Sequence, residues 1–160
     1  MKKIKIVLLL LMPLLSSAQT ETFNLYHSDA DAKAELMQAV KQAAVEHKHV
    51  FMIIGGNWCK WCRIFDKFQH EHYKIDSAFH ANYVLLHVNF SKENKNNELM
   101  KELDFPQRFG FPVFVILNEK GEKIHTQNTS YLEKDEGYDE DKVLEFLDQW
   151  SMNALKPENY

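Results

Sequence analysis

The stretch from residue 50 to residue 54, Val-Phe-Met-Ile-Ile, constrains the fold more than any other part of the chain. It is apolar at every position, and the flexible pair Gly55-Gly56 follows it. A run this short with no polar position is typical of a central strand that is buried on both faces. Such a strand must be covered from above and below, so the rest of the chain has to supply a layer on each side.

Further segments bounded by turn residues predict three more strands, at residues 83–90, 112–117 and 122–126. Helices are predicted where apolar side chains recur every three or four positions. The predicted helices are residues 28–47, 63–72, 76–81, 98–103 and 141–150. Strands alternate with helices until a last antiparallel pair, which predicts a single α/β domain with a central mixed β-sheet flanked by helices on both faces.

The first predicted helix is amphipathic. Ser28 or Asp29 is the expected N-cap, and residues 47–49, His-Lys-His, close the helix with groups that suit its negative end. Small and apolar side chains at steps of three and four define the face expected to be buried. These residues are Ala30, Ala34, Met37, Val40 and Ala44.

Residues 1–18 are predicted to be a cleaved signal peptide, which leaves residues 19–160 as the folded domain. Three lysines precede an apolar run at residues 6–15, and Ser16 and Ala18 place small side chains before a cut at Gln19. The run is shorter than a membrane-spanning helix requires. We therefore expect a periplasmic or secreted protein.

Composition excludes several classes of function. The formal net charge is −4, from 19 basic and 23 acidic residues, so no basic excess exists to neutralise nucleic-acid phosphates. The apolar fraction is 45%, which supplies a core and excludes a disordered chain. We expect a monomer that binds no nucleic acid and carries no cofactor.

The two cysteines of the chain, Cys59 and Cys62, are three positions apart. A disulfide between them would close a very small loop and would add little stability, so the spacing favours chemistry over a structural role. Cys59 is predicted at the first turn of a helix, where free backbone N–H groups favour the thiolate and lower the pKa; Lys60 adds positive charge. Cys59 is thus the expected outer nucleophile, and Cys62 the buried residue that resolves a mixed disulfide.

Residues 51–62 and 110–116, with Gly121, resemble the thioredoxin superfamily. The first segment is similar to the family's core strand and its Trp-Cys-x-x-Cys site, here Trp58 to Cys62, and the second to its proline loop, strand and hairpin. The resemblance implies a thioredoxin-like fold and a cis peptide bond before Pro112, close to the cysteines. It also implies thiol–disulfide exchange with cysteines of other exported proteins, and a membrane protein as electron donor for a reductase.

Three departures from the family leave the direction of electron flow open. Ile53 stands where the family has a buried Asp, and Lys67 where it has a helix-kinking Pro. The dipeptide Lys60-Trp61 matches neither the Gly-Pro of reductive members nor the Pro-His of oxidases. The lysine and the absence of a histidine favour a reductase. Asp66, one turn after Cys62, is a candidate replacement for the missing acid.

Other interpretations of these residues are open at this stage. The cysteines could belong to a copper-binding module of the same fold, completed by a nearby histidine, although the chain has no second Cys-x-x-Cys. Trp58 is expected to shield the site, Trp61 to contact substrate, and Phe111 to line the substrate groove beside Pro112. Residues 128–130, Asn-Thr-Ser, match a glycosylation sequon to which we assign no function.

Overall fold

The structure is a computed structural model that describes residues 23–160. Its main sheet has four strands, in the order β2–β1–β3–β4. β1 pairs in parallel with β2 and antiparallel with β3, and β3 pairs antiparallel with β4. These strands are β1 His49–Gly55, β2 Tyr83–Asn89, β3 Val113–Leu117 and β4 Lys123–Asn128. The prediction of a mixed sheet is confirmed, and so is the central position of the apolar run at residues 50–54, which lies in β1.

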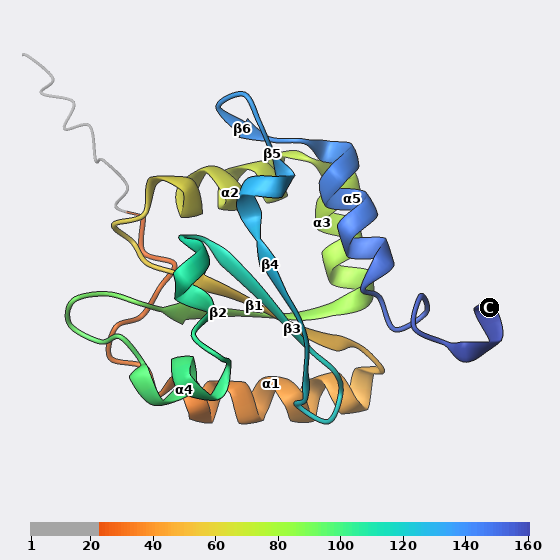
Figure 1. Ribbon diagram of the computed structural model, residues 1–160, viewed down its shortest axis with the longest axis horizontal. Helices are drawn as coiled ribbons and strands as arrows, with labels where there is room; N and C mark the ends of the chain where they lie inside the picture. The colour runs from red at the N-terminus through yellow and green to blue at the C-terminus, as the bar shows by residue number, and fades with distance from the viewer. Residues whose placement is uncertain (1–22) are drawn as a thin grey trace, which may run out of the picture.

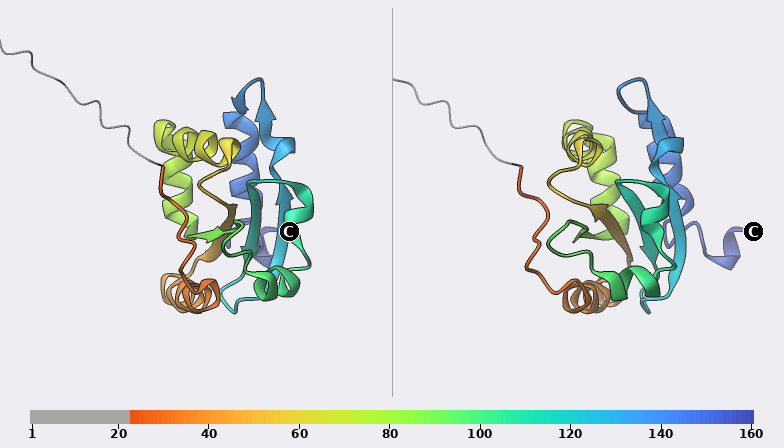
Figure 2. Two further views of the ribbon diagram at one scale, coloured as in Figure 1. Left: turned by 90° about the vertical axis from the view of Figure 1, so that its left-hand side faces the viewer. Right: turned by 60° about the vertical axis from the view of Figure 1, so that its left-hand side comes forward.

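Helices cover both faces of the sheet (Figures 1 and 2). One face carries α1, and the other carries α2, α3 and α5. The helices are α1 Ala32–Glu46, α2 Lys60–Glu71, α3 Tyr73–Asn82, α4 Asn97–Glu102 and α5 Glu140–Gln149. Within residues 23–160, no helix is both long and apolar enough to cross a membrane. The predicted signal peptide, residues 1–18, lies outside the described residues.

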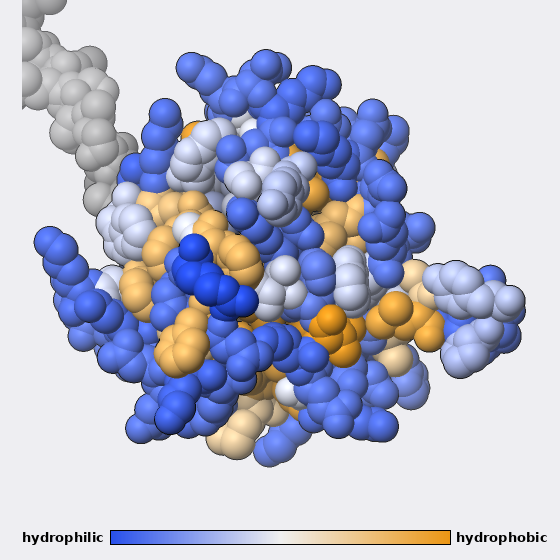
Figure 3. Space-filling model, in the orientation of Figure 1, coloured by the Kyte–Doolittle hydropathy of each residue, from blue (hydrophilic) through white to orange (hydrophobic). Residues whose placement is uncertain are grey.

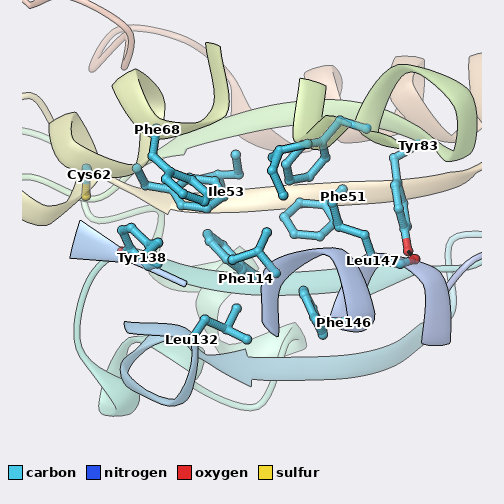
Figure 4. Packing of buried hydrophobic residues seen from close by; sticks show 14 of the residues in the cluster. Phe51, Ile53, Cys62, Phe68, Tyr83, Phe114, Leu132, Tyr138, Phe146 and Leu147 are labelled. Carbon is cyan, nitrogen blue, oxygen red and sulfur yellow. Dashed lines mark hydrogen bonds between the residues drawn. The ribbon is translucent and has the colours of Figure 1, made fainter. Parts of the chain in front are cut away.

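The central strand divides its side chains between two cores, as the strand period of two requires. Val50, Met52 and Ile54 lie in the core beneath α1, whereas Phe51 and Ile53 lie in the core beneath α2, α3 and α5. All seven residues of β1 are buried. The second core is strongly aromatic, and Figure 4 shows Cys62 at one of its ends.

The first helix is rotated relative to the prediction. Its buried residues are Ala32, Ala39 and Ala43, while Met37 is 61% exposed. The helix also begins later than expected, because Asp31 caps it by accepting from the backbone N–H groups of Lys33 and Ala34. Three alanines lie against the sheet, and the larger Met37 faces outward. Of the residues predicted to be buried, Val40 packs on the core beside Leu36, whereas Met37 and Ala44 are exposed, so the predicted face is wrong except at Val40.

The segment between β4 and α5, in which no helix or strand was predicted, contains two short structures. The 3-10 turn η2, Thr129–Leu132, leads into a two-stranded hairpin of β5 Glu133–Lys134 and β6 Gly137–Tyr138. Tyr138 of this hairpin is buried against α2. The centroid of its ring lies 4.9 Å from that of Phe65. Another 3-10 turn, η1 Pro106–Phe109, precedes β3. Both turns lie beside the candidate site.

Candidate active site

Cys59 and Cys62 form a disulfide at the start of α2. Cys59 is the N-cap of this helix, and its Sγ accepts a hydrogen bond from the backbone N–H of Cys62 at 3.1 Å. The predicted position of the pair at a helix start is confirmed. The sulfur of Cys59 therefore meets an unpaired backbone donor and the positive end of the helix dipole, both of which favour negative charge on it.

The outer cysteine is less exposed than the sequence predicted. Cys59 is 4% exposed and Cys62 is 2% exposed, so the disulfide is buried as a unit. The reason is local: as the N-cap, Cys59 turns its sulfur back over the helix end toward Cys62 rather than outward. Trp61 and Phe111 are half-buried and pack against the core cluster that contains both cysteines. An incoming sulfur must enter beside these side chains.

Gly55, the last residue of β1, makes room for the disulfide. A Cβ added at Gly55 would lie 2.5 Å from Cys62 Sγ and 3.0 Å from Tyr26 Oη. The next residue, Gly56, has a similar role, since a Cβ there would overlap the indole of Trp58. The two glycines thus do more than end the strand, because they let the backbone pass close beneath the sulfur and the tryptophan.

The proline loop meets the cysteine segment through aromatic side chains. The Phe111–Pro112 peptide bond is cis, as the family resemblance implied. Phe111 packs edge-on against Trp58 with ring centroids 5.4 Å apart, and it also packs on Phe90 at 5.0 Å. Trp58 Nε1 donates to the carbonyl of Phe90 at 2.8 Å, which fixes the indole. The fold therefore brings Trp58, which follows β1, and Phe111 and Pro112, which precede β3, to the same end of the two central strands.

Other candidate residues surround the site in different ways. Lys60 is exposed on the first turn of α2, next to Cys59. Trp61 lies edge-on to Tyr138, with ring centroids 5.8 Å apart. Asp66 is one turn further along, its side chain is 26% exposed, and its carboxylate lies 3.6 Å from Nδ1 of His70. Asp66 thus lies on the same helix as the cysteines, four residues after Cys62, with its carboxylate partly exposed to solvent.

Thr129 supports the proline loop, a role that sequence reasoning missed. Its Oγ1 donates to the carbonyl of Pro112 at 2.7 Å, and the residue is 4% exposed. The sequence showed Thr129 only as part of a sequon. No local pattern could have indicated this contact, because Thr129 follows β4 and Pro112 precedes β3, and only the pairing of these two strands brings the residues together.

Asn57 and Tyr26 are two further residues that the sequence did not single out. Asn57 Oδ1 accepts from the backbone N–H groups of Leu25 and Tyr26, each at 3.0 Å, and its Nδ2 donates to the carbonyl of Tyr26 at 2.8 Å. The active-site loop thus clamps the segment that precedes α1. These hydrogen bonds hold the Tyr26 side chain, which is 1% exposed, close to Gly55, where Cys62 Sγ also lies.

Apolar surface and a pocket lie beside the cysteines. Figure 3 shows apolar side chains gathered over the part of this face that carries η1, where Phe105 is 52% exposed and Phe109 is 38% exposed. A pocket of about 640 Å³ lies between Trp58 and the segment that follows β2. Its lining residues are Ser28, Asn57, Trp58, Asn89, Phe90, Ser91, Lys92, Glu93 and Lys95. Trp58 and Phe90 are the apolar members of this lining.

A search of residues 23–160 for metal sites finds no group of three or more His, Cys, Asp or Glu side chains that could hold an ion. Both cysteine sulfurs are engaged in the disulfide. The arrangement of the site is that of a dithiol–disulfide pair.

Comparisons with known proteins agree with this geometry. A family model described as thioredoxin-like matches residues 31–119. A disulphide isomerase from Xylella fastidiosa Temecula1 has a similar structure, with a TM-score of 0.65 and 22% identity over 78% of this chain and 95% of that one. The oxidised C-terminal domain of DsbD from Neisseria meningitidis gives a TM-score of 0.54 and 21% identity over 75% and 96%. No curated protein sequence matches the chain.

Gly55→Ala tests the close packing beneath the disulfide. The added methyl group would overlap Cys62 Sγ, so we expect the free energy of unfolding of the oxidised protein to fall by about 1–3 kcal/mol. Gly137→Ala is the matched control, because nothing lies within 4 Å of a Cβ at that position, and its effect should stay within about 0.5 kcal/mol. Urea unfolding of both variants measures the difference. Equal stability of the two variants would contradict the packing described.

Proposed function

This chain belongs to the thioredoxin-like family, and we propose on that basis that it is an exported thiol–disulfide oxidoreductase acting on cysteines of other exported proteins. The observation that carries the proposal is the Cys59–Cys62 disulfide at the N-terminus of α2, next to the packed pair Trp58 and Phe111. A disulfide that spans three residues contributes little to stability, yet this one sits where a helix end favours a thiolate.

The exchange proceeds in two steps from the reduced protein. The Cys59 thiolate attacks one sulfur of a substrate disulfide, which forms a mixed disulfide and releases the other substrate sulfur as a thiolate. Cys62 then loses its proton to water and attacks Cys59 Sγ. The Cys59–Cys62 bond forms, the second substrate sulfur leaves, and both substrate thiolates take protons from water. Two electrons pass to the substrate, so a dithiol donor must reduce the protein again.

The substrate segment is proposed to lie over Trp58, Trp61 and Phe111. Trp58 is 56% exposed, which makes its indole available to a polypeptide, and the other two are half-buried next to the cysteines. Lys60 adds one positive charge beside Cys59 and assists the attack by favouring the thiolate. Because Cys59 is nearly buried, a substrate must be an extended segment that can reach between these side chains.

We propose that electrons flow toward the substrate, so that the protein is a reductase whose donor is a membrane protein. Lys60 and the lack of a histidine in the dipeptide support this direction. The signal peptide predicted at residues 1–18 supports a periplasmic or secreted location. If export is correct, N-terminal sequencing of the mature protein will start at Gln19, and a mature chain that retains Met1 would contradict it.

Serine substitutions separate the roles of the two cysteines. Cys59→Ser should lower the reduction of insulin disulfides to the uncatalysed rate, because the nucleophile is lost. Cys62→Ser should retain the first step and accumulate mixed disulfides with its substrates, visible as adducts on non-reducing gels. The double variant is the control and should form no adduct. Activity of Cys59→Ser, or adducts on Cys62 in that variant, would contradict the assignment.

The direction of electron flow is tested by equilibration with glutathione at fixed pH. A reductase is expected to have a potential near that of thioredoxin, about −270 mV, whereas a strong oxidase such as DsbA lies at about −120 mV. Quantifying the oxidised fraction of Cys59–Cys62 across glutathione ratios gives the value. A potential near the second figure would contradict the reductase and leave the exchange chemistry in place.

A further inference from the structure

A tyrosine hydroxyl behind the disulfide has no partner. Tyr26 is 1% exposed, and its Oη forms no hydrogen bond with any residue from 23 to 160. Buried hydroxyl groups are nearly always paired, because one that leaves water without gaining a partner destabilises the fold. An unpaired group of this kind needs an explanation, and its position suggests one.

The sulfur of Cys62 borders the same small space as this hydroxyl. A Cβ at Gly55 would lie 2.5 Å from Cys62 Sγ and 3.0 Å from Tyr26 Oη, so both atoms lie within 3.0 Å of the same point beside Gly55. In the disulfide the sulfur of Cys62 is bonded to Cys59 and carries no charge. A thiolate in the same place would be a far better hydrogen-bond acceptor.

Tyr26 is held rigidly in this position. Asn57, two residues before Cys59, binds its backbone on both sides, through the N–H at 3.0 Å and the carbonyl at 2.8 Å. The Tyr26 ring lies edge-on to His87 at 5.6 Å and packs with Phe23 at 6.4 Å. The hydroxyl is therefore placed by the same loop that places the cysteines, and little side-chain entropy remains to be lost when it finds a partner.

The surroundings keep Tyr26 a hydrogen-bond donor. Burial raises its pKa far above the ordinary value, and the charges of Asp66 and Tyr138 raise it further. Burial, with a smaller effect of His70, lowers the pKa of His87 to about 4, so His87 is neutral at pH 7 and supplies no positive charge. Ile53, which pairs with His87 across the sheet and stands where the family has a buried acid, offers no polar atom.

We propose that Tyr26 donates a hydrogen bond from its hydroxyl to the sulfur of Cys62 when the disulfide is reduced, and so stabilises the resolving thiolate. The inference rests on the proposed function and identifies the group that serves Cys62 in place of the missing acid. Cys62 gives its proton to water, Tyr26 keeps its own, and the held thiolate attacks Cys59 Sγ and expels the substrate sulfur.

This hydrogen bond would exist in the reduced state and not in the disulfide state. Tyr26 therefore shifts the equilibrium of the Cys59–Cys62 pair toward the dithiol, and its removal shifts the equilibrium toward the disulfide. The change Tyr26→Phe deletes only the hydroxyl, which has no partner in the oxidised protein, so the oxidised variant keeps every hydrogen bond of that state.

The test is the equilibrium of the pair with glutathione at pH 7 in wild type, Tyr26→Phe and Tyr83→Phe. For Tyr26→Phe we expect the constant for reduction to fall about tenfold, which is about 30 mV toward a more negative potential. Tyr83 is the matched control, since its buried hydroxyl donates to the carbonyl of Leu147 at 2.6 Å, at the opposite end of the aromatic core from Cys62 (Figure 4). Tyr83→Phe should lose stability and leave the potential unchanged.

An unchanged potential in Tyr26→Phe, or an equal shift in Tyr83→Phe, would overturn the proposal. A measurement on the wild type needs no variant: in spectra of isotope-labelled tyrosine, the hydroxyl proton of Tyr26 should become protected from exchange on reduction, and that of Tyr83 should not change. No change at Tyr26 would also overturn it. Failure of the proposed function is read separately, as absence of insulin reduction, while the potential of the pair can still be measured.

Discussion

The contact between the backbone N–H of Cys62 and the sulfur of Cys59, 3.1 Å long, is the interaction on which the rest of the site depends. It makes a cysteine the N-cap of α2, so the sulfur that is proposed to react is also the group that satisfies the helix end. When the disulfide opens, the same donor and the helix dipole face a thiolate, and a charged acceptor gains more from both than a neutral one. The local structure and the chemistry are thus two consequences of one arrangement.

The sheet sets this arrangement in a nearly closed environment. β1 is buried on both faces, and its last residue, Gly55, runs directly beneath Cys62. The loop before β3 arrives from the other side and brings Phe111 against Trp58. The disulfide is almost inaccessible to solvent, so under the proposed function a substrate sulfur has to enter beside Trp61 and Phe111. Specificity would then come from shape around the sulfur as much as from the sulfur itself.

Much of this could be predicted from the sequence, because the controlling signals are local. An unbroken apolar run predicted the central strand, and the spacing and position of the cysteines predicted their helix end. The face predicted for α1 was wrong except at Val40, because alanines recur along two faces of this helix and only packing against the sheet selects between them. Asn57, Thr129 and Tyr26 were missed since each acts on a segment far away in sequence. A polar residue that serves a distant backbone or sulfur leaves no periodic signal.

The most direct test of the account is the titration of the Cys59 thiol in the reduced protein. The rate of its alkylation is measured as a function of pH, and the variant Cys62→Ser supplies a form with Cys59 as its single thiol. If the end of α2 stabilises the thiolate, the midpoint will lie clearly below the value of about 8.5 for a free cysteine. A midpoint at or above that value would show that the helix end does not activate Cys59, and the proposed exchange would lose its physical basis.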